Sequence, residues 1–261
     1  MFSKFLLLLV IVALVVYIRK TNKKKARLQT NPDPLHPLLQ EHVRFYQHLD
    51  AGQQSLFRSR VAHFLDTTRI TPVGDVALRE LDRVYVGASA IIPIFSFKDW
   101  TYNNLNEVLI YGEYFTKDFD RQAAQKNVMG MVGDGAMHRM MILSLPALRA
   151  GFEQNGTGNT GIHEFVHLLD KADGATDGIP EYLLPKDMIA PWVRYAHEAI
   201  QDIRNRRSEI NPYGATNDAE FFAVISEYFF QKPHLLEEHH PELFKILEEI
   251  YHTPASFAGA E

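Results

Sequence analysis

Residues 160–174 read TGIHEFVHLLDKADG, and this stretch contains two histidines four residues apart with a glutamate directly after the first. Residues four apart lie on the same face of an α-helix, so His163 and His167 could offer two imidazoles to one metal ion. Glu164 projects about 100° round the helix from His163, beside that ion, where a base for a zinc-activated water is needed. The pattern therefore predicts a catalytic zinc site on a helix.

The helix that carries this motif is expected over residues 160–172, with Asn159 or Thr160 as its N-cap. Histidine pairs at this spacing also occur on solvated helix faces, which is the alternative interpretation. The neighbouring residues are apolar, however, so the helix is expected to be largely buried: Phe165, Val166, Leu168 and Leu169. Buried histidines need polar partners, and this favours the metal interpretation.

A catalytic zinc takes three protein ligands and keeps one open position, so a third ligand is needed. A second apolar helix is expected over residues 218–231, DAEFFAVISEYFFQ. Its Glu220 and Glu227 are seven residues apart and share one face, where a buried carboxylate would need a cation. On geometry alone, either glutamate could be the ligand. Asp170 would lie about 10 Å along the first helix from His163, so we expect it to support the site or the fold instead.

The composition limits the kinds of function available to the chain. Its 261 residues, 46% of them hydrophobic, are enough for one sizeable core. The net charge of -5 shows no basic excess, so a nucleic-acid partner is not expected. The chain has no cysteine, which excludes disulfides, thiolate metal sites and a cysteine nucleophile.

The N-terminus differs from the rest of the chain. Residues 5–18, FLLLLVIVALVVYI, are uninterrupted apolar, and the basic stretch RKTNKKKARL follows them. This order of apolar run and charge predicts a membrane anchor over residues 1–18, a single N-terminal span with the catalytic domain on the cytoplasmic side. A cleaved secretory signal is the alternative. Residues 19–37 then form a basic and Pro-rich linker, and residues 38–261 are expected to be the folded domain that carries the zinc site.

The remaining patterns predict a mixture of helices and strands. Helical spacing covers much of 38–64, 187–207 and 241–252, whereas 107–115 and 139–145 are typical of strands. The apolar run within 77–95 could be a buried helix or a strand, because periodicity cannot distinguish them. The strand at 139–145 could be an edge along which a substrate lies extended, or an ordinary central strand. The order of the elements favours an α+β fold over alternating βαβ units.

Two segments together, HEFVHLLDKADG and YGATNDAEFFAVISEYFF, resemble the Mlc titration factor A family of zinc metallopeptidases. That family is related in its catalytic core to the anthrax lethal factor protease domain. The resemblance covers roughly residues 35–255. It implies a zincin-like metallopeptidase domain, with a small sheet and an active-site HExxH helix. It also implies one Zn²⁺ per chain, bound by His163, His167 and Glu220, with Glu164 as the base.

The resemblance carries further implications. It places Tyr213 near the metal and makes Glu227 the partner of a ligand histidine. Members of the family are associated with binding a sugar-responsive transcriptional repressor, which implies a transcriptional regulator as a partner. The family is known from soluble members, so the apolar N-terminus of this chain departs from the family pattern.

We therefore predict a membrane-tethered zinc-dependent peptidase that hydrolyses peptide or protein substrates. In this hypothesis Glu164 takes a proton from the attacking water, and Tyr213 donates a hydrogen bond to the developing oxyanion. The alternative is a regulator-binding protein that keeps the zinc site with little or no turnover. A zinc hydrolase acting on a non-peptide bond is a third interpretation, since the same site chemistry attacks other carbonyls.

Overall fold

The computed structural model describes residues 33–97, 100–113, 130–132, 139–153, 158–181 and 183–251. The chain divides into two compact units, residues 1–37 and residues 38–261. The predicted anchor over 1–18 and most of the predicted linker over 19–37 lie outside the described residues. Within the described part of the chain, no helix is both long enough and apolar enough to span a membrane.

The first helical region consists of three helices, where the sequence pattern indicated an almost continuous one. They are α2 (Leu35–His42), α3 (Arg44–Gln47) and α4 (Ala51–Thr67). Helix α4 starts anew because the Asp50 carboxylate accepts from the Gln53 backbone N–H and the Gln53 side chain accepts from the Asp50 N–H. Helix α2 starts inside the predicted linker, since a proline is tolerated in the first turn of a helix.

Helix α5 (Glu80–Ile91) resolves the ambiguous run within 77–95 as a helix. Every residue from Val84 to Ile91 is buried, because α4, α6 (Leu145–Ala150) and α7 (Thr160–Asp170) all pack against it. A helix covered on several sides needs no polar face. This burial explains why the sequence showed no amphipathic period there.

The sheet has four described strands in the order β1-β2-β4-β3. Strands β1 (Arg69–Val73), β2 (Glu107–Tyr111) and β4 (Met140–Ser144) run parallel, and β3 (Gly130–Val132) pairs antiparallel with β4. The two predicted strands are therefore present. However, the idea that 139–145 is an edge strand is wrong, because β4 is hydrogen-bonded on both sides. Among the described strands, β1 and β3 form the two edges.

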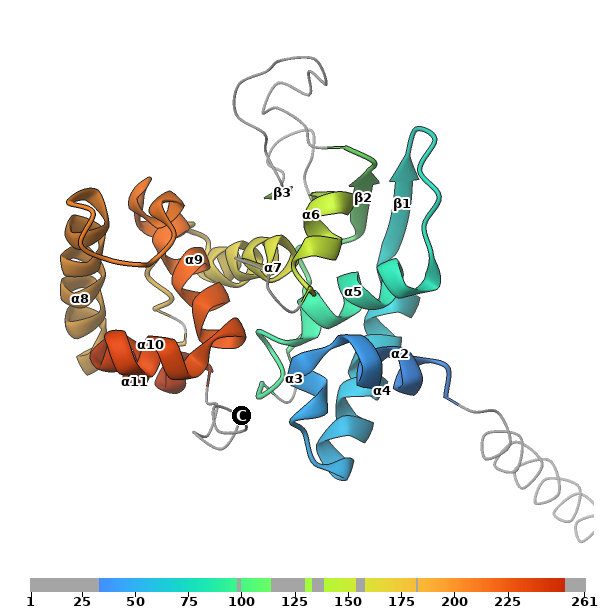
Figure 1. The fold of residues 1–261 in the computed structure, drawn as a ribbon, viewed down its shortest axis with the longest axis horizontal. Coiled ribbons are helices and arrows are strands. Elements are labelled where there is room, and N and C mark those ends of the chain that lie inside the picture. The colour runs from blue at the N-terminus through green and yellow to red at the C-terminus, as the bar shows by residue number, and fades with distance from the viewer. Residues whose placement is uncertain are drawn as a thin grey trace, which may run out of the picture. The chain divides into compact units, whose positions relative to one another are not determined.

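The C-terminal half is helical. After α7 come η2 (Lys171–Asp173), α8 (Lys186–Arg204), η3 (Pro212–Ala215), α9 (Asp218–Gln231), α10 (Pro233–His239) and α11 (Pro241–Tyr251). The grouping of these helices after the strands agrees with the predicted α+β class. Helix α7 lies between α5 on one side and α9 on the other (Figure 1). The α7–α9 contact is the one that assembles the candidate site.

Candidate metal centre

The orientation of α7 is fixed at its start and along its apolar face. Asn159 is its N-cap, and the Asn159 side chain accepts a hydrogen bond from the Ile162 backbone N–H. Phe165, fully buried, packs its ring against those of Phe64 and Tyr102, at centroid distances of 5.6 and 5.1 Å. Because these contacts hold one face of α7 in the core, the face that carries the histidines is turned toward α9.

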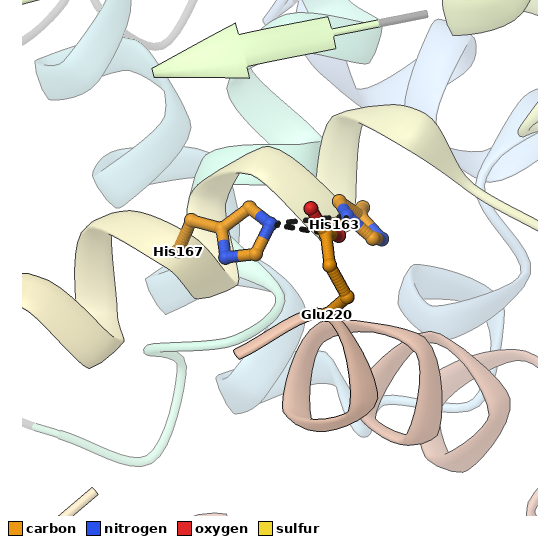
Figure 2. A group of neighbouring side chains, drawn as sticks. All are labelled: His163, His167 and Glu220. Atoms are coloured by element: carbon orange, nitrogen blue, oxygen red, sulfur yellow. Dashed lines mark hydrogen bonds and ion pairs between the residues drawn. The ribbon is translucent and has the colours of Figure 1, made fainter. Parts of the chain in front are cut away.

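Three side chains from α7 and α9 converge on one point, as Figure 2 shows. His163 Nε2 lies 3.1 Å from His167 Nε2 and 3.0 Å from Glu220 Oε2, and His167 Nε2 lies 3.4 Å from the same oxygen. Donors bound about 2.0 Å from a tetrahedral metal are about 3.3 Å apart. The three residues expected to be ligands therefore lie at the spacing that a metal ion requires.

Glu227 occupies the other side of the His163 ring. Its Oε1 lies 2.6 Å from His163 Nδ1, and its Oε2 accepts a hydrogen bond from the Asn159 backbone N–H at 2.6 Å. The convergent donor group therefore contains Glu220 and not Glu227. The two glutamates that the sequence could not tell apart by geometry contact opposite nitrogens of one imidazole.

Glu164 is buried beside the two histidines, with 4% of its surface exposed. Its Oε2 has no hydrogen-bond partner among the described residues. Burial raises the pKa of this carboxyl, although the neighbouring His163 and His167 act in the opposite direction. A carboxylate with a raised pKa and an unpartnered oxygen is suited to accepting a proton.

Tyr213 lies where the resemblance implied, next to the convergent group. It is on η3, its hydroxyl donates to Glu220 Oε1 at 3.2 Å, and its ring is 6.0 Å from that of His163. Burial and the nearby negative charge of Glu220 raise the pKa of this phenol to about 12. Tyr213 therefore stays a hydrogen-bond donor at neutral pH, and it remains 47% exposed, accessible to a bound molecule.

The charges of the cluster favour a cation at the point where the donors meet. Burial alone would lower the pKa of His163, but its hydrogen bonds with Glu220 and Glu227 prevail and raise that pKa to about 10. Burial also opposes ionisation of Glu220, yet the hydrogen bonds from His163 and His167 hold its pKa well below the usual range. Without a metal, the proton on His163 provides the positive charge at this point. A metal ion can replace this proton.

Asp170 has the structural role that the sequence suggested. Its Oδ2 accepts a hydrogen bond from the Gly178 backbone N–H at 3.0 Å, and the Gly178 carbonyl accepts from Trp192 Nε1 at 2.8 Å. Gly178 has a φ of 76°, and a Cβ there would lie 2.2 Å from the Asp218 carbonyl oxygen. This loop thus ties the end of α7 to the start of α9, two residues before Glu220. Gly178 was not among the residues predicted from the sequence, although an Asp-Gly pair is a turn signal.

A buried HExxH helix, joined by a carboxylate from a second helix on an α+β scaffold, is the arrangement of a metallopeptidase. The chain belongs to the glucose-regulated metallo-peptidase M90 family, whose family model matches residues 18–252. This finding confirms the resemblance noted from the two sequence segments.

Individual relatives match over most of their length. Mlc titration factor A of Pectobacterium atrosepticum is 28% identical over 204 residues, which cover 72% of this chain and 74% of the relative. Mlc titration factor A of Escherichia fergusonii is 28% identical over 219 residues, covering 78% and 80%. An uncharacterized protein of Synechocystis sp. is 27% identical over 240 residues, covering 87% of each chain.

Proposed function

We propose that this chain is a zinc-dependent peptidase with His163, His167 and Glu220 as the metal ligands. The observation that carries the proposal is the convergence of these three donor atoms next to a buried carboxylate, Glu164, that has an unpartnered oxygen in the described structure. Two histidines and one glutamate are a donor set of catalytic zinc sites, which keep a fourth position open. The geometry therefore fits one Zn²⁺ per chain.

The residues around the proposed metal position would each contribute to one step of peptide hydrolysis. Bound zinc would polarise a carbonyl oxygen and lower the pKa of a water molecule. The unpartnered oxygen of Glu164 would accept the proton of the attacking water and deliver it to the leaving amine. Tyr213 would turn its hydroxyl from Glu220 to the developing oxyanion. In other enzymes the loss of one such donor costs about 3 kcal/mol of transition-state stabilisation.

A transcriptional regulator is proposed as an additional partner. Two of the three relatives described above are named Mlc titration factor A, a name that refers to the regulator Mlc. Binding alone would give no reason for a buried, unpartnered carboxylate beside a metal site, because such a group is unfavourable without a role in proton transfer. Glu164 therefore favours turnover over a binding protein that merely keeps the site.

The membrane anchor also stays a proposal. The apolar run over residues 5–18 and the basic residues after it support a single N-terminal span with the catalytic domain on the cytoplasmic side. The anchor would keep the peptidase domain near the membrane surface.

The test compares the full-length chain with its Glu164→Gln variant on a mixed peptide library in the presence of zinc. We expect both proteins to bind one zinc and the variant to cleave about 10²- to 10⁴-fold more slowly than the wild type. Equal cleavage by the two proteins would remove Glu164 from the role of base. Zinc binding without cleavage of any peptide would favour a binding protein, and cleavage of simple esters alone would favour a non-peptide hydrolase.

A further inference from the structure

The Glu227 carboxylate contacts α7 at two places, and the proposed mechanism assigns this carboxylate no role. One oxygen contacts Nδ1 of His163, and the other contacts the backbone N–H of Asn159, each at 2.6 Å. The side chain of Glu227 is 12% exposed and Asn159 is 2% exposed, so little water competes for these contacts. A single carboxylate on α9 thus holds both the N-cap of α7 and its first histidine.

Gly158 provides the room that this carboxylate occupies. A Cβ built at Gly158 would lie 2.7 Å from Glu227 Oε2, closer than real Cβ contacts come. The same oxygen receives the Asn159 N–H, so it cannot move away without losing that hydrogen bond. Any side chain at position 158 would therefore displace the carboxylate from its partners.

The contact also determines which nitrogen of His163 is available to a metal. An ionised carboxylate only accepts hydrogen bonds, so the proton must be on Nδ1. In the neutral imidazole the lone pair is then on Nε2, the atom that faces His167 and Glu220. Partners of this kind orient a ligand histidine and raise its basicity.

We propose that Glu227 and Gly158 are positioning residues that aim Nε2 of His163 at the metal, Glu227 by direct contact and Gly158 by leaving space for it. This inference rests on the proposed metal site. Gly158 touches neither the donor atoms nor the point where they meet, yet metal affinity depends on it.

The test measures the zinc dissociation constant of four full-length variants by competition with a chromophoric chelator. Glu227→Gln should weaken zinc binding about 10- to 100-fold, because an amide offers one acceptor oxygen to two N–H donors. Gly158→Ala should weaken it in the same direction. Two controls should bind as the wild type does: Gly112→Ala, where the new Cβ would lie 3.0 Å from a Val76 methyl group, and Gln231→Ala, which removes a hydrogen bond from α9 to the Gly151 carbonyl.

A second measurement separates positioning from a general loss of structure. In nuclear magnetic resonance spectra of the metal-free protein, the His163 Nδ1 proton and the Asn159 amide proton should be protected from exchange with solvent. At least one of them should lose protection in Glu227→Gln and in Gly158→Ala, but not in the two controls. The double variant Gly158→Ala/Glu227→Gln should bind zinc no more weakly than Glu227→Gln alone, because both changes break the same contact.

Wild-type affinity and unchanged proton protection in Glu227→Gln would overturn the proposal for both residues. An effect in Glu227→Gln with none in Gly158→Ala would overturn the role of Gly158. If the wild type binds no zinc, the proposed function fails, and the proton measurements still decide whether Glu227 holds His163 and Asn159.

Discussion

Three glutamates surround the two histidines, and their different contacts define different roles. Glu220 places one oxygen among the imidazole nitrogens, whereas Glu227 holds the far side of the His163 ring. Glu164 keeps one buried oxygen without a hydrogen-bond partner in the described structure. At the scale of residues, the proposed division into ligand, positioning residue and base follows from what each carboxylate contacts.

Replacing Glu220 by Ala should abolish stoichiometric zinc binding. The change removes one of three donors and leaves two histidines, which hold the metal far more weakly than the complete set. The measurement is the zinc content per chain after extensive dialysis, by elemental analysis. Tyr213→Phe is the matched control, because it removes the other contact of Glu220 without removing a donor atom and should keep its zinc. One zinc retained in Glu220→Ala would show that Glu220 is not a required ligand.

The stability of the metal-free protein should depend on pH through His163. Its pKa is raised from the ordinary 6.5 to about 10, so its stabilising contribution is complete below pH 6.5 and is lost as the pH rises toward 10. Zinc must displace this proton, so zinc affinity should increase over the same window. Urea unfolding of the metal-free wild type at pH 6 and pH 9 tests this against His163→Gln, whose free energy of unfolding should change less between the two. Equal changes in both proteins would contradict the assignment.

Much of the site could be predicted from sequence because His163, Glu164 and His167 lie within one helical turn. The choice between Glu220 and Glu227 could not be predicted from helix geometry. Residues seven apart lie on the same helix face, so the pattern directs both carboxylates the same way. The family resemblance favoured Glu220, and the structure places that carboxylate at the donor atoms. Gly158 gave no recognisable signal, because its proposed role depends on a side chain 69 residues further along the chain.

At the scale of elements, an ion pair between a buried carboxylate and a partly exposed arginine joins α5 to α6. The Asp82 carboxylate, 1% exposed, accepts from Arg149 Nε at 2.7 Å and Nη2 at 2.8 Å, and from the Arg79 backbone N–H at 2.7 Å. Burial opposes the charge of Asp82, but these hydrogen bonds prevail and hold its pKa well below the usual range. The pair fixes the start of α5, which in turn supports α7.

Replacing Asp82 by Asn should destabilise the fold by about 2 kcal/mol at pH 7, because the arginines lose charge-assisted hydrogen bonds to a buried carboxylate while they stay partly solvated. The wild-type pKa is depressed, so this contribution is present above pH 3.8 and is lost as the pH falls below it. Urea unfolding at pH 7 and pH 3 should therefore show a smaller difference between the proteins at the lower pH. An undiminished difference at pH 3 would mean that packing, and not charge, is responsible.

Local sequence patterns predicted some helices and strands correctly but left others unassigned or missed them. The helix over 218–231 is found with the same bounds, because an N-cap and a change of composition limit it. The run within 77–95 could not be assigned, since a helix covered by three neighbours has no polar face. Helix α10 was missed because it is a seven-residue helix that begins at Pro233, too short for a clear period. The segment 139–145 lies inside the sheet because β3 pairs with β4. The residues of 139–145 by themselves do not encode that pairing.

For the whole molecule, the main prediction concerns residues 1–18. The full-length chain should remain with membranes after an alkaline carbonate wash, whereas a chain lacking residues 1–27 should appear in the supernatant. Protease added to the outer face of intact cells should leave the catalytic domain whole, because in the proposed orientation the basic residues after the apolar run keep that domain in the cytoplasm. Release of the full-length chain by carbonate would exclude a spanning anchor, and digestion from outside would reverse the proposed orientation.

The ribosome makes α7 well before it makes α9. Glu220 and Glu227 come 57 and 64 residues after His163, which at typical rates of synthesis is a delay of about 3 to 13 s. During this interval the nascent chain has two imidazoles but lacks Glu220, the proposed third donor, and Glu227, the proposed positioning residue. Tight metal loading must therefore follow the emergence of α9. If the proposed ligands are right, a chain whose synthesis stops between the two helices lacks the third donor, so premature termination there leaves fragments without a complete metal site.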